Sequence, residues 1–191
     1  GGVGVGLMNY YIFIIIAVFI SGLMVGRTPE FLGKKIEAEE MKIAIILALL
    51  HPLLILSGTA IATFLATNNS GLSSEWLNNP SFHGLSEMLY EYTSSAANNG
   101  SGFEGLGDNT SFWNISTGIV LIMGRYIPII GQIAIVGILA NKKYIPEGAG
   151  TLKTDTATFS IMTFAVIVII AALAFFPALT LGPIAEFLTM R

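Results

Sequence analysis

Four long apolar runs dominate the chain and predict four membrane-crossing helices. The runs extend from Leu7 to about Gly26, from Ile43 to about Ala66, from about Phe112 to Ala140, and from about Phe159 to Leu181. Each supplies the roughly 20 apolar residues that a helix needs to cross the hydrocarbon core of a bilayer. We expect Pro52 to kink the second helix, because proline removes a backbone donor and collides with the preceding turn.

A fifth apolar pattern is too short to cross a bilayer. Leu85, Met88, Leu89 and Tyr92 recur at i, i+3, i+4 and i+7, which predicts a short helix with one apolar face. This helix leads into a small polar loop, Ser94–Phe103. Two structures fit the segment. In the first, the segment belongs to a hairpin that enters the membrane, and its carbonyl groups line a pore. In the second, it is an ordinary surface loop, because Asn, Gly and Ser are also common in such loops.

The composition is that of an integral membrane protein. Hydrophobic residues make up 53% of the 191 residues and charged residues 11%, with a mean hydropathy of +0.74. A typical soluble domain is about 25% charged. The absence of cysteine excludes disulfides and thiolate metal sites, and His51 and His83 show no metal-ligand spacing, so we expect both to be structural. Because Gly1 is not an initiator methionine and no charged segment precedes the first apolar run, we expect no signal peptide and a chain that is part of a longer one.

The basic residues predict an orientation. Seven of the nine Lys and Arg residues lie in segments 27–42 and 141–158, which the positive-inside rule places in the cytoplasm. Segment 67–111 and the C-terminus then lie outside. Segment 67–111 holds five acidic residues and no basic one. If this segment surrounds the outer mouth of a pore, its negative charge would concentrate cations there. Arg125 lies within the third apolar run, where a charge costs roughly 2.5 to 3.5 kcal/mol, so we expect it to face protein or water and to have a partner or a gating role.

Four longer motifs resemble one family. Residues 26–35 (GRTPEFLGKK), 83–87 (HGLSE), 95–101 (SAANNGS) and 182–186 (GPIAE) closely resemble the potassium-binding A subunit of the bacterial Kdp potassium-transporting ATPases. The resemblance covers essentially the whole chain and implies the C-terminal third of such a subunit. The implied fold is an all-α integral membrane fold with four transmembrane helices and one re-entrant pore helix with its filter loop. It forms part of a four-repeat, potassium-channel-like fold.

The resemblance also implies a division of the chain. Residues 1–40 correspond to the inner helix of the third pore repeat and a cytoplasmic loop. Residues 41–140 correspond to the fourth repeat, with its helix, re-entrant pore loop and second helix. Residues 141–191 correspond to a cytoplasmic loop, the final transmembrane helix and an outer tail. The filter segments of the first three repeats would lie outside this sequence.

Site residues follow from the same resemblance. Ala97, Asn98, Asn99 and Gly100 correspond to the fourth repeat's part of the filter, with K⁺ bound at the last three. The family often has a third asparagine where this chain has Ala97, which leaves only a backbone carbonyl there. Residues assigned to gating or to the ion tunnel are Arg27, Arg125, and Gly2, Gly4 and Gly6 of the glycine-rich start.

The implied function is potassium uptake across the bacterial plasma (inner) membrane. K⁺ would bind from outside at the filter and pass through an intersubunit tunnel to a P-type ATPase catalytic subunit, with small accessory subunits completing the complex. We expect no catalytic site, no bound ATP and no nucleic-acid partner for this chain, since it has neither a phosphate-cradling loop nor a phosphorylatable aspartate motif. The residues alone leave two other classes open: a secondary cation transporter with a re-entrant gating loop, and an intramembrane serine hydrolase using Ser101 with His51 as its base.

Overall fold

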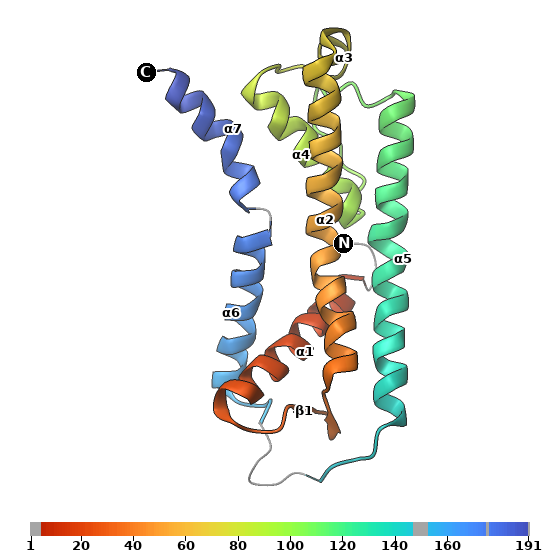
Figure 1. Ribbon diagram of the computed structural model, residues 1–191, viewed down its shortest axis with the longest axis vertical. Coiled ribbons are helices and arrows are strands. Elements are labelled where there is room, and N and C mark those ends of the chain that lie inside the picture. Colours follow the sequence, from red (N-terminus) through yellow and green to blue (C-terminus); the bar gives the residue numbers. More distant parts are fainter. Residues whose placement is uncertain (1–4, 147–152, 175, 191) are drawn as a thin grey trace. The chain divides into compact units, whose positions relative to one another are not determined.

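A computed structural model describes residues 5–146, 153–174 and 176–190. The described residues form helices and one short β-hairpin (Figure 1). The helices are α1 (Val5–Val25), α2 (Ala38–Asn68), α3 (Ser70–Trp76), α4 (Phe82–Ala97), α5 (Ser111–Asn141), α6 (Ala157–Ala174) and α7 (Phe176–Thr189). The antiparallel hairpin pairs β1 (Glu30–Phe31) with β2 (Lys34–Lys35).

The structure confirms four helices long and apolar enough to cross a membrane, and it shows helix beyond the predicted end at Leu181. These helices are α1, α2, α5 and α6. The sequence predicted one helix from Phe159 to Leu181 followed by a tail. The structure describes helix on both sides of residue 175, as α6 and α7, and α7 continues to Thr189, beyond the predicted end. Helix α2 continues through Pro52. The kink expected at this proline stays a prediction.

The hairpin and α3 were not predicted. Leu32 and Gly33 connect the two strands with φ values of +52° and +70°, as a type I′ turn requires at both central positions. Leucine rarely adopts this conformation, so only Gly33 of the two turn residues is of a type that predicts such a turn. Asn69 caps α3, and its side-chain oxygen accepts hydrogen bonds from the backbone N–H groups of Gly71 at 3.0 Å and Leu72 at 3.4 Å.

The described chain divides into two compact units, which we treat separately. Unit 1 consists of residues 50–126 and 172–190, and unit 2 consists of residues 5–49 and 127–171 without the segment 147–152. The division passes through both α2 and α5, so each of these helices contributes to both units. It follows compactness rather than the repeats implied by the family resemblance, and the division into repeats stays a prediction.

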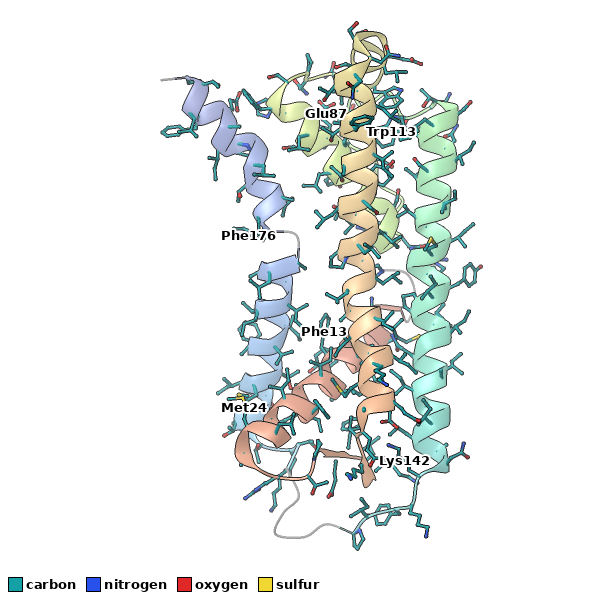
Figure 2. The ribbon with its side chains drawn as sticks, viewed as in Figure 1. Phe13, Met24, Glu87, Trp113, Lys142 and Phe176 are labelled. Carbon is teal, nitrogen blue, oxygen red and sulfur yellow. The ribbon has the colours of Figure 1, made fainter. Side chains whose placement is uncertain are left out.

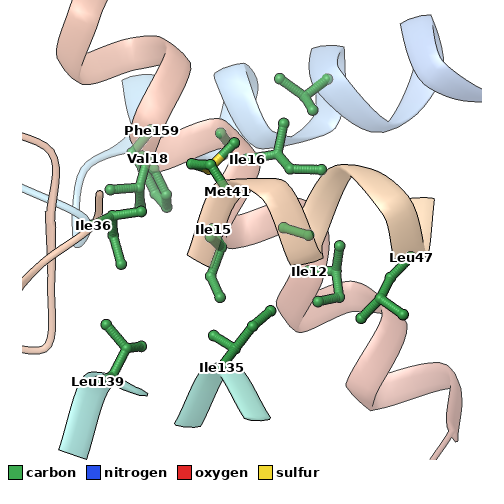
Figure 3. Packing of buried hydrophobic residues seen from close by; sticks show 13 residues of the cluster. Ile12, Ile15, Ile16, Val18, Ile36, Met41, Leu47, Ile135, Leu139 and Phe159 are labelled. Carbon is green, nitrogen blue, oxygen red and sulfur yellow. The ribbon is translucent and has the colours of Figure 1, made fainter. Parts of the chain in front are cut away.

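An apolar core holds unit 2 together (Figure 3). Ile15 of α1 and Ile135 of α5 are inaccessible to solvent, and Ile36, which follows the hairpin, is nearly so. Further members come from α1, α2, α5 and α6, including Ile12, Val18, Met41, Leu47, Leu139 and Phe159. Apolar side chains from four helices therefore pack together in a single core of unit 2.

A cluster of charged side chains closes one end of unit 2 around Lys142, labelled in Figure 2. Its Nζ lies 2.6 Å from Oε1 of the fully buried Glu40 and 2.9 Å from Oε2 of Glu37, and it donates a hydrogen bond to the carbonyl of Lys35 at 3.0 Å. Burial alone would lower the pKa of Lys142, but its hydrogen bonds to Glu40 and Glu37 outweigh this and raise it. Hydrogen bonds from Lys142 and Lys35 lower the pKa of Glu37.

Candidate functional site

In unit 1 the short helix α4 packs closely against both α2 and α5 (Figure 1). A Cβ atom at Gly58 of α2 would collide with the ring of Tyr92, and one at Gly124 of α5 would lie 2.5 Å from the carbonyl oxygen of Ala96. The Tyr92 hydroxyl donates to Ser116 Oγ of α5 at 3.0 Å. Glycine at these two positions therefore allows α4 to approach both long helices.

These contacts place the C-terminal end of α4 beside the middle of α5. Gly124 lies thirteen residues after Ser111, where α5 begins, which corresponds to about 20 Å along the helix. His51 of α2 reaches the same level, because its Nε2 lies 3.1 Å from the Gly124 carbonyl oxygen. The loop that follows α4 thus starts deep between two helices that are each long enough to cross a membrane.

The predicted apolar face of α4 is confirmed. Met88, Leu89 and Tyr92 are buried, and Leu85 is half-buried. An aromatic cluster supports this face, with the Tyr92 and Trp113 ring centroids 5.4 Å apart. Trp113 also meets Trp76 of α3 edge-on at 5.4 Å, so the cluster fixes α3, α4 and the start of α5 together.

Glu87 has a role that the sequence did not reveal. Its side chain is fully buried and accepts hydrogen bonds from the Asn78 backbone N–H at 3.3 Å and from the Asn79 backbone N–H and Nδ2, both at 2.8 Å (Figure 2). The carboxylate therefore organises the turn that leads into α4. Glu91 is buried as well, at 8% exposure. Two of the five acids expected at an open mouth are thus held within the fold.

Asn98 ends α4 in a left-handed conformation. Its φ and ψ are 58° and 36°, and its backbone N–H and that of Asn99 donate to the carbonyls of Ser95 at 3.1 Å and Ser94 at 3.0 Å. Asparagine tolerates this conformation better than most residues do. Gly100 follows with φ +74° and no neighbouring atom within 4 Å of a Cβ built on it. The chain therefore turns sharply where the resemblance puts the filter, and Asn99 and Gly100 are exposed.

The side chain of Asn98 joins α4 to α5. Its Nδ2 lies 3.2 Å from the carbonyl oxygen of Ala96 and 3.3 Å from that of Leu121. Its buried Oδ1 has no hydrogen-bond partner among the described residues. With the amide nitrogen bound to the carbonyls of Ser95, Ala96 and Leu121, the oxygen atoms that Asn98 itself could offer an ion are its backbone carbonyl and Oδ1.

Ser101 is held by other hydroxyl groups of α4. Its Oγ lies 2.9 Å from Ser94 Oγ and 3.1 Å from the Tyr90 hydroxyl, and its backbone N–H donates to Ser94 Oγ at 3.2 Å. The ring of His51, the candidate base of a serine hydrolase, binds the carbonyl of Gly124 instead. The geometry therefore gives Ser101 a place in the loop's hydrogen-bond network, and its hydrogen-bond partners among the described residues are hydroxyl groups and not His51.

The residues assigned to gating are spread over both units. Arg125 of α5 is half-buried, and its Nε is buried without a hydrogen-bond partner in the described part of the chain. Arg27 is exposed just after α1, and its backbone N–H donates to the carbonyl of Gly22 at 2.8 Å. Gly6 lies within α1, whereas Gly2 and Gly4 lie outside the described residues.

α7 docks on the first turns of α4. A Cβ atom at Gly182 would lie 2.7 Å from the Phe82 carbonyl oxygen and 2.9 Å from Ser86 Oγ, so the two helices touch closely there. One turn further along α7, Glu186 Oε1 lies 2.9 Å from His83 Nε2. This contact brings together two of the motifs that carry the family resemblance, 83–87 and 182–186.

Comparison with known proteins decides the family. Residues 1–188 match the family described as Potassium-transporting ATPase A subunit. The chain belongs to this family. It is 71% identical over its whole length to the "Potassium-transporting ATPase potassium-binding subunit" of Flavobacterium psychrophilum, covering 35% of that protein. Proteins with the same description from Phocaeicola vulgatus and Geobacillus kaustophilus are 72% and 59% identical over the whole chain, which covers 34% and 33% of them.

The resemblance found in the sequence is thereby confirmed. The chain spans about a third of the length of these Potassium-transporting ATPase A subunit relatives. The motif 95–101 ends α4 and forms the following turn, and the motif 26–35 directly follows α1 and forms the hairpin. The four motifs that carried the resemblance therefore lie at turns and helix contacts, whereas the match to the family extends over residues 1–188.

Proposed function

We propose that this chain forms the fourth-repeat portion of a potassium-binding subunit that works in an ATP-driven K⁺ uptake complex. In this proposal α4 is a re-entrant pore helix, and Ala97, Asn98, Asn99 and Gly100 supply one quarter of a selectivity filter. Such filters are rings of backbone carbonyls that replace an ion's hydration shell. The other three quarters come from segments that this chain does not contain.

One observation carries the proposal: the sharp turn at Asn98–Gly100 starts beside the middle of α5, about 20 Å from its beginning. Irregular backbone at that depth is tolerated only where protein buries it or where it lines a wet cavity. The C-terminal end of a helix carries partial negative charge, so α4 ends with its dipole suited to a cation. Gly100 leaves space for neighbouring carbonyls because it has no side chain.

The partners follow from the family. The relatives are named as potassium-binding subunits of a potassium-transporting ATPase, and we infer that this chain likewise binds K⁺ from outside and passes it to a P-type ATPase subunit that hydrolyses ATP. Accessory subunits would complete the complex in the bacterial plasma membrane. Segments 27–42 and 141–158 would face the cytoplasm, as the positive-inside rule predicts.

Gly100→Ser tests the filter in the intact complex. Serine adds bulk at a position with φ +74°, where a side chain also costs roughly 1 to 2 kcal/mol of backbone strain. We expect the K⁺ concentration for half-maximal ATPase stimulation to rise at least about tenfold, which corresponds to 1.4 kcal/mol. Stimulation by Na⁺ should become measurable because the carbonyl ring is distorted.

Gly102→Ser is the matched control. It lies two residues away in the same loop without a positive φ, and a Cβ there meets the Asp108 and Glu91 carboxylates at an ordinary 3.4 Å. We expect its K⁺ response to stay within about twofold of the wild type, under 0.5 kcal/mol. Unchanged K⁺ stimulation and ion selectivity in Gly100→Ser would contradict the proposed filter.

A further inference from the structure

Ser94, in the last turn of α4, binds the following loop at two points. Its backbone carbonyl accepts a hydrogen bond from the Asn99 N–H at 3.0 Å, and its Oγ accepts one from the Ser101 N–H at 3.2 Å. The Ser94 side chain is buried, at 4% exposure. One residue of unit 1 therefore holds the backbone on both sides of Gly100.

These two hydrogen bonds determine the direction of two carbonyl groups. In a planar trans peptide, the C=O of one residue points opposite to the N–H of the next. Because the N–H groups of Asn99 and Ser101 point toward Ser94, the carbonyls of Asn98 and Gly100 point away from it. Asn99 and Gly100 are exposed, and no atom lies within 4 Å of a Cβ built on Gly100. The turn thus presents carbonyl oxygens away from its own helix.

A second hydroxyl group of α4 holds Ser101 in place. Ser101 Oγ lies 2.9 Å from Ser94 Oγ and 3.1 Å from the Tyr90 hydroxyl. Tyr90 and Ser94 are four positions apart in α4, so both lie on one face of the helix. The Tyr90 ring also meets Phe103 edge-on, with ring centroids 5.6 Å apart. Three connected hydroxyl groups and one aromatic contact therefore fasten the end of the loop to α4.

We propose that Ser94 is a positioning residue for ion recognition, which directs the carbonyls of Asn98 and Gly100 toward K⁺, and that the Tyr90 hydroxyl supports it through Ser101. This inference rests on the proposed function. If one of these peptide planes rotated, its carbonyl would turn away and its N–H, which repels a cation, would take its place. The hydrogen bonds to Ser94 oppose that rotation. Because carbonyl arrangement governs ion selectivity, they contribute to discrimination among ions as well as to K⁺ affinity.

Ser94→Ala in the intact ATPase complex tests the anchor. Alanine keeps the helix and the backbone carbonyl but removes the acceptor of the Ser101 N–H. We expect the K⁺ concentration for half-maximal ATPase stimulation to rise about fivefold, the effect of one lost hydrogen bond. Stimulation by Na⁺ relative to K⁺ should increase, and turnover at saturating K⁺ should stay within about twofold. A merely structural role would instead lower the yield of assembled complex and leave the ion preference unchanged.

Tyr90→Phe is a milder variant that does not depend on Ser94→Ala assembling. It removes one hydroxyl group from an exposed side chain and keeps the ring that contacts Phe103. We expect about a twofold to threefold rise in the half-maximal K⁺ concentration, with the same change in ion preference. Thr93→Val is the matched control, because the Thr93 hydroxyl donates to the Leu89 carbonyl at 2.6 Å within α4 and does not bind the loop. It should leave both ion responses unchanged.

Two results would overturn the inference. The first is an unchanged K⁺ response and ion preference in Ser94→Ala or, if that variant does not assemble, in Tyr90→Phe. The second is an equal change in Thr93→Val. If either occurred while Gly100→Ser still weakened the K⁺ response, the proposed filter would stand without this anchor. If Gly100→Ser also had no effect, the filter itself would be wrong.

Discussion

The end of α4 in unit 1 and the core of unit 2 are stabilised in different ways. Around α4 the close contacts involve glycine, hydroxyl groups and backbone carbonyls, as at Gly124 and Ser94. In unit 2 aliphatic side chains such as Ile15 and Ile135 interlock, and the Lys142 cluster closes one end. The first arrangement fixes the position of a few carbonyls, whereas the second supplies apolar contact area.

This difference predicts different consequences of mutation. A backbone contact through glycine has no flexible side chain to absorb an added atom, so a small change at α4 should displace the turn at Asn98–Gly100, the proposed filter segment. Apolar packing tolerates changes of similar volume, at a cost that usually stays below 1.5 kcal/mol. Mutations around α4 in unit 1 should therefore change the response to K⁺. Mutations in the core of unit 2 should instead change the stability and assembly of the complex.

Lys142→Met should have the largest effect on stability. It leaves the Glu40 carboxylate buried without its cation, and breaking a buried pair typically costs about 3 kcal/mol. We expect a marked loss of thermal stability of the intact complex in detergent with an unchanged K⁺ response. Lys143→Met is the control, since Lys143 is exposed, and it should change stability by under about 0.5 kcal/mol. Equal effects of the two variants would contradict a separate role for the cluster.

Gly124→Ala should affect the ion response more than stability. The added methyl group would lie 2.5 Å from the Ala96 carbonyl oxygen and would push the end of α4 away, at a cost of about 2 kcal/mol. We expect a weaker apparent K⁺ affinity in the ATPase assay. Gly118→Ala on the same helix is matched, because no atom lies within 4 Å of its Cβ, and it should leave affinity unchanged. Similar K⁺ affinities for Gly124→Ala and Gly118→Ala would contradict the view that the close contact of α5 with α4 controls the ion response.

Gly182→Ala should weaken the docking of α7 on α4. The Cβ atom would lie 2.7 Å from the Phe82 carbonyl oxygen, and we expect a loss of about 1 kcal/mol, measured as faster hydrogen exchange in α7. His83→Gln tests the neighbouring exposed pair with Glu186 and should cost under about 0.5 kcal/mol. A larger effect of His83→Gln would show that the ion pair, not the close backbone contact, holds the helices together.

The smallest effect concerns acid and Glu37. Hydrogen bonds from Lys142 and Lys35 lower its pKa in the folded chain, so its contribution to stability is complete above the ordinary glutamate pKa of about 4.3. It is lost as the pH falls through the lower, folded-state pKa. We expect the melting temperature of the wild type to exceed that of Glu37→Gln slightly at pH 6, and the gap to close in stronger acid. A gap independent of pH would exclude this linkage.

The sequence predicted the elements that depend on regular spacing. Apolar run length identified α1, α2 and α5, and the i, i+3, i+4, i+7 pattern identified α4. It failed where tertiary contacts decide: helix continues past the predicted end at Leu181, and Glu87, one acid of an acidic segment, is buried with its carboxylate bound to the N–H groups of Asn78 and Asn79. Gly124 had no local signal, because the close approach of Ala96 is visible only in three dimensions.

The amide of Asn98 has a consequence for the surrounding lipid. Because Nδ2 bonds to carbonyls of both α4 and α5, the position of the turn at Asn98–Gly100 depends on the tilt of a long helix as well as on the loop. Helices of this kind tilt when bilayer thickness changes. If this turn supplies filter carbonyls as proposed, acyl-chain length should therefore change the apparent K⁺ affinity of the intact complex, with the Asn98 side chain as the link.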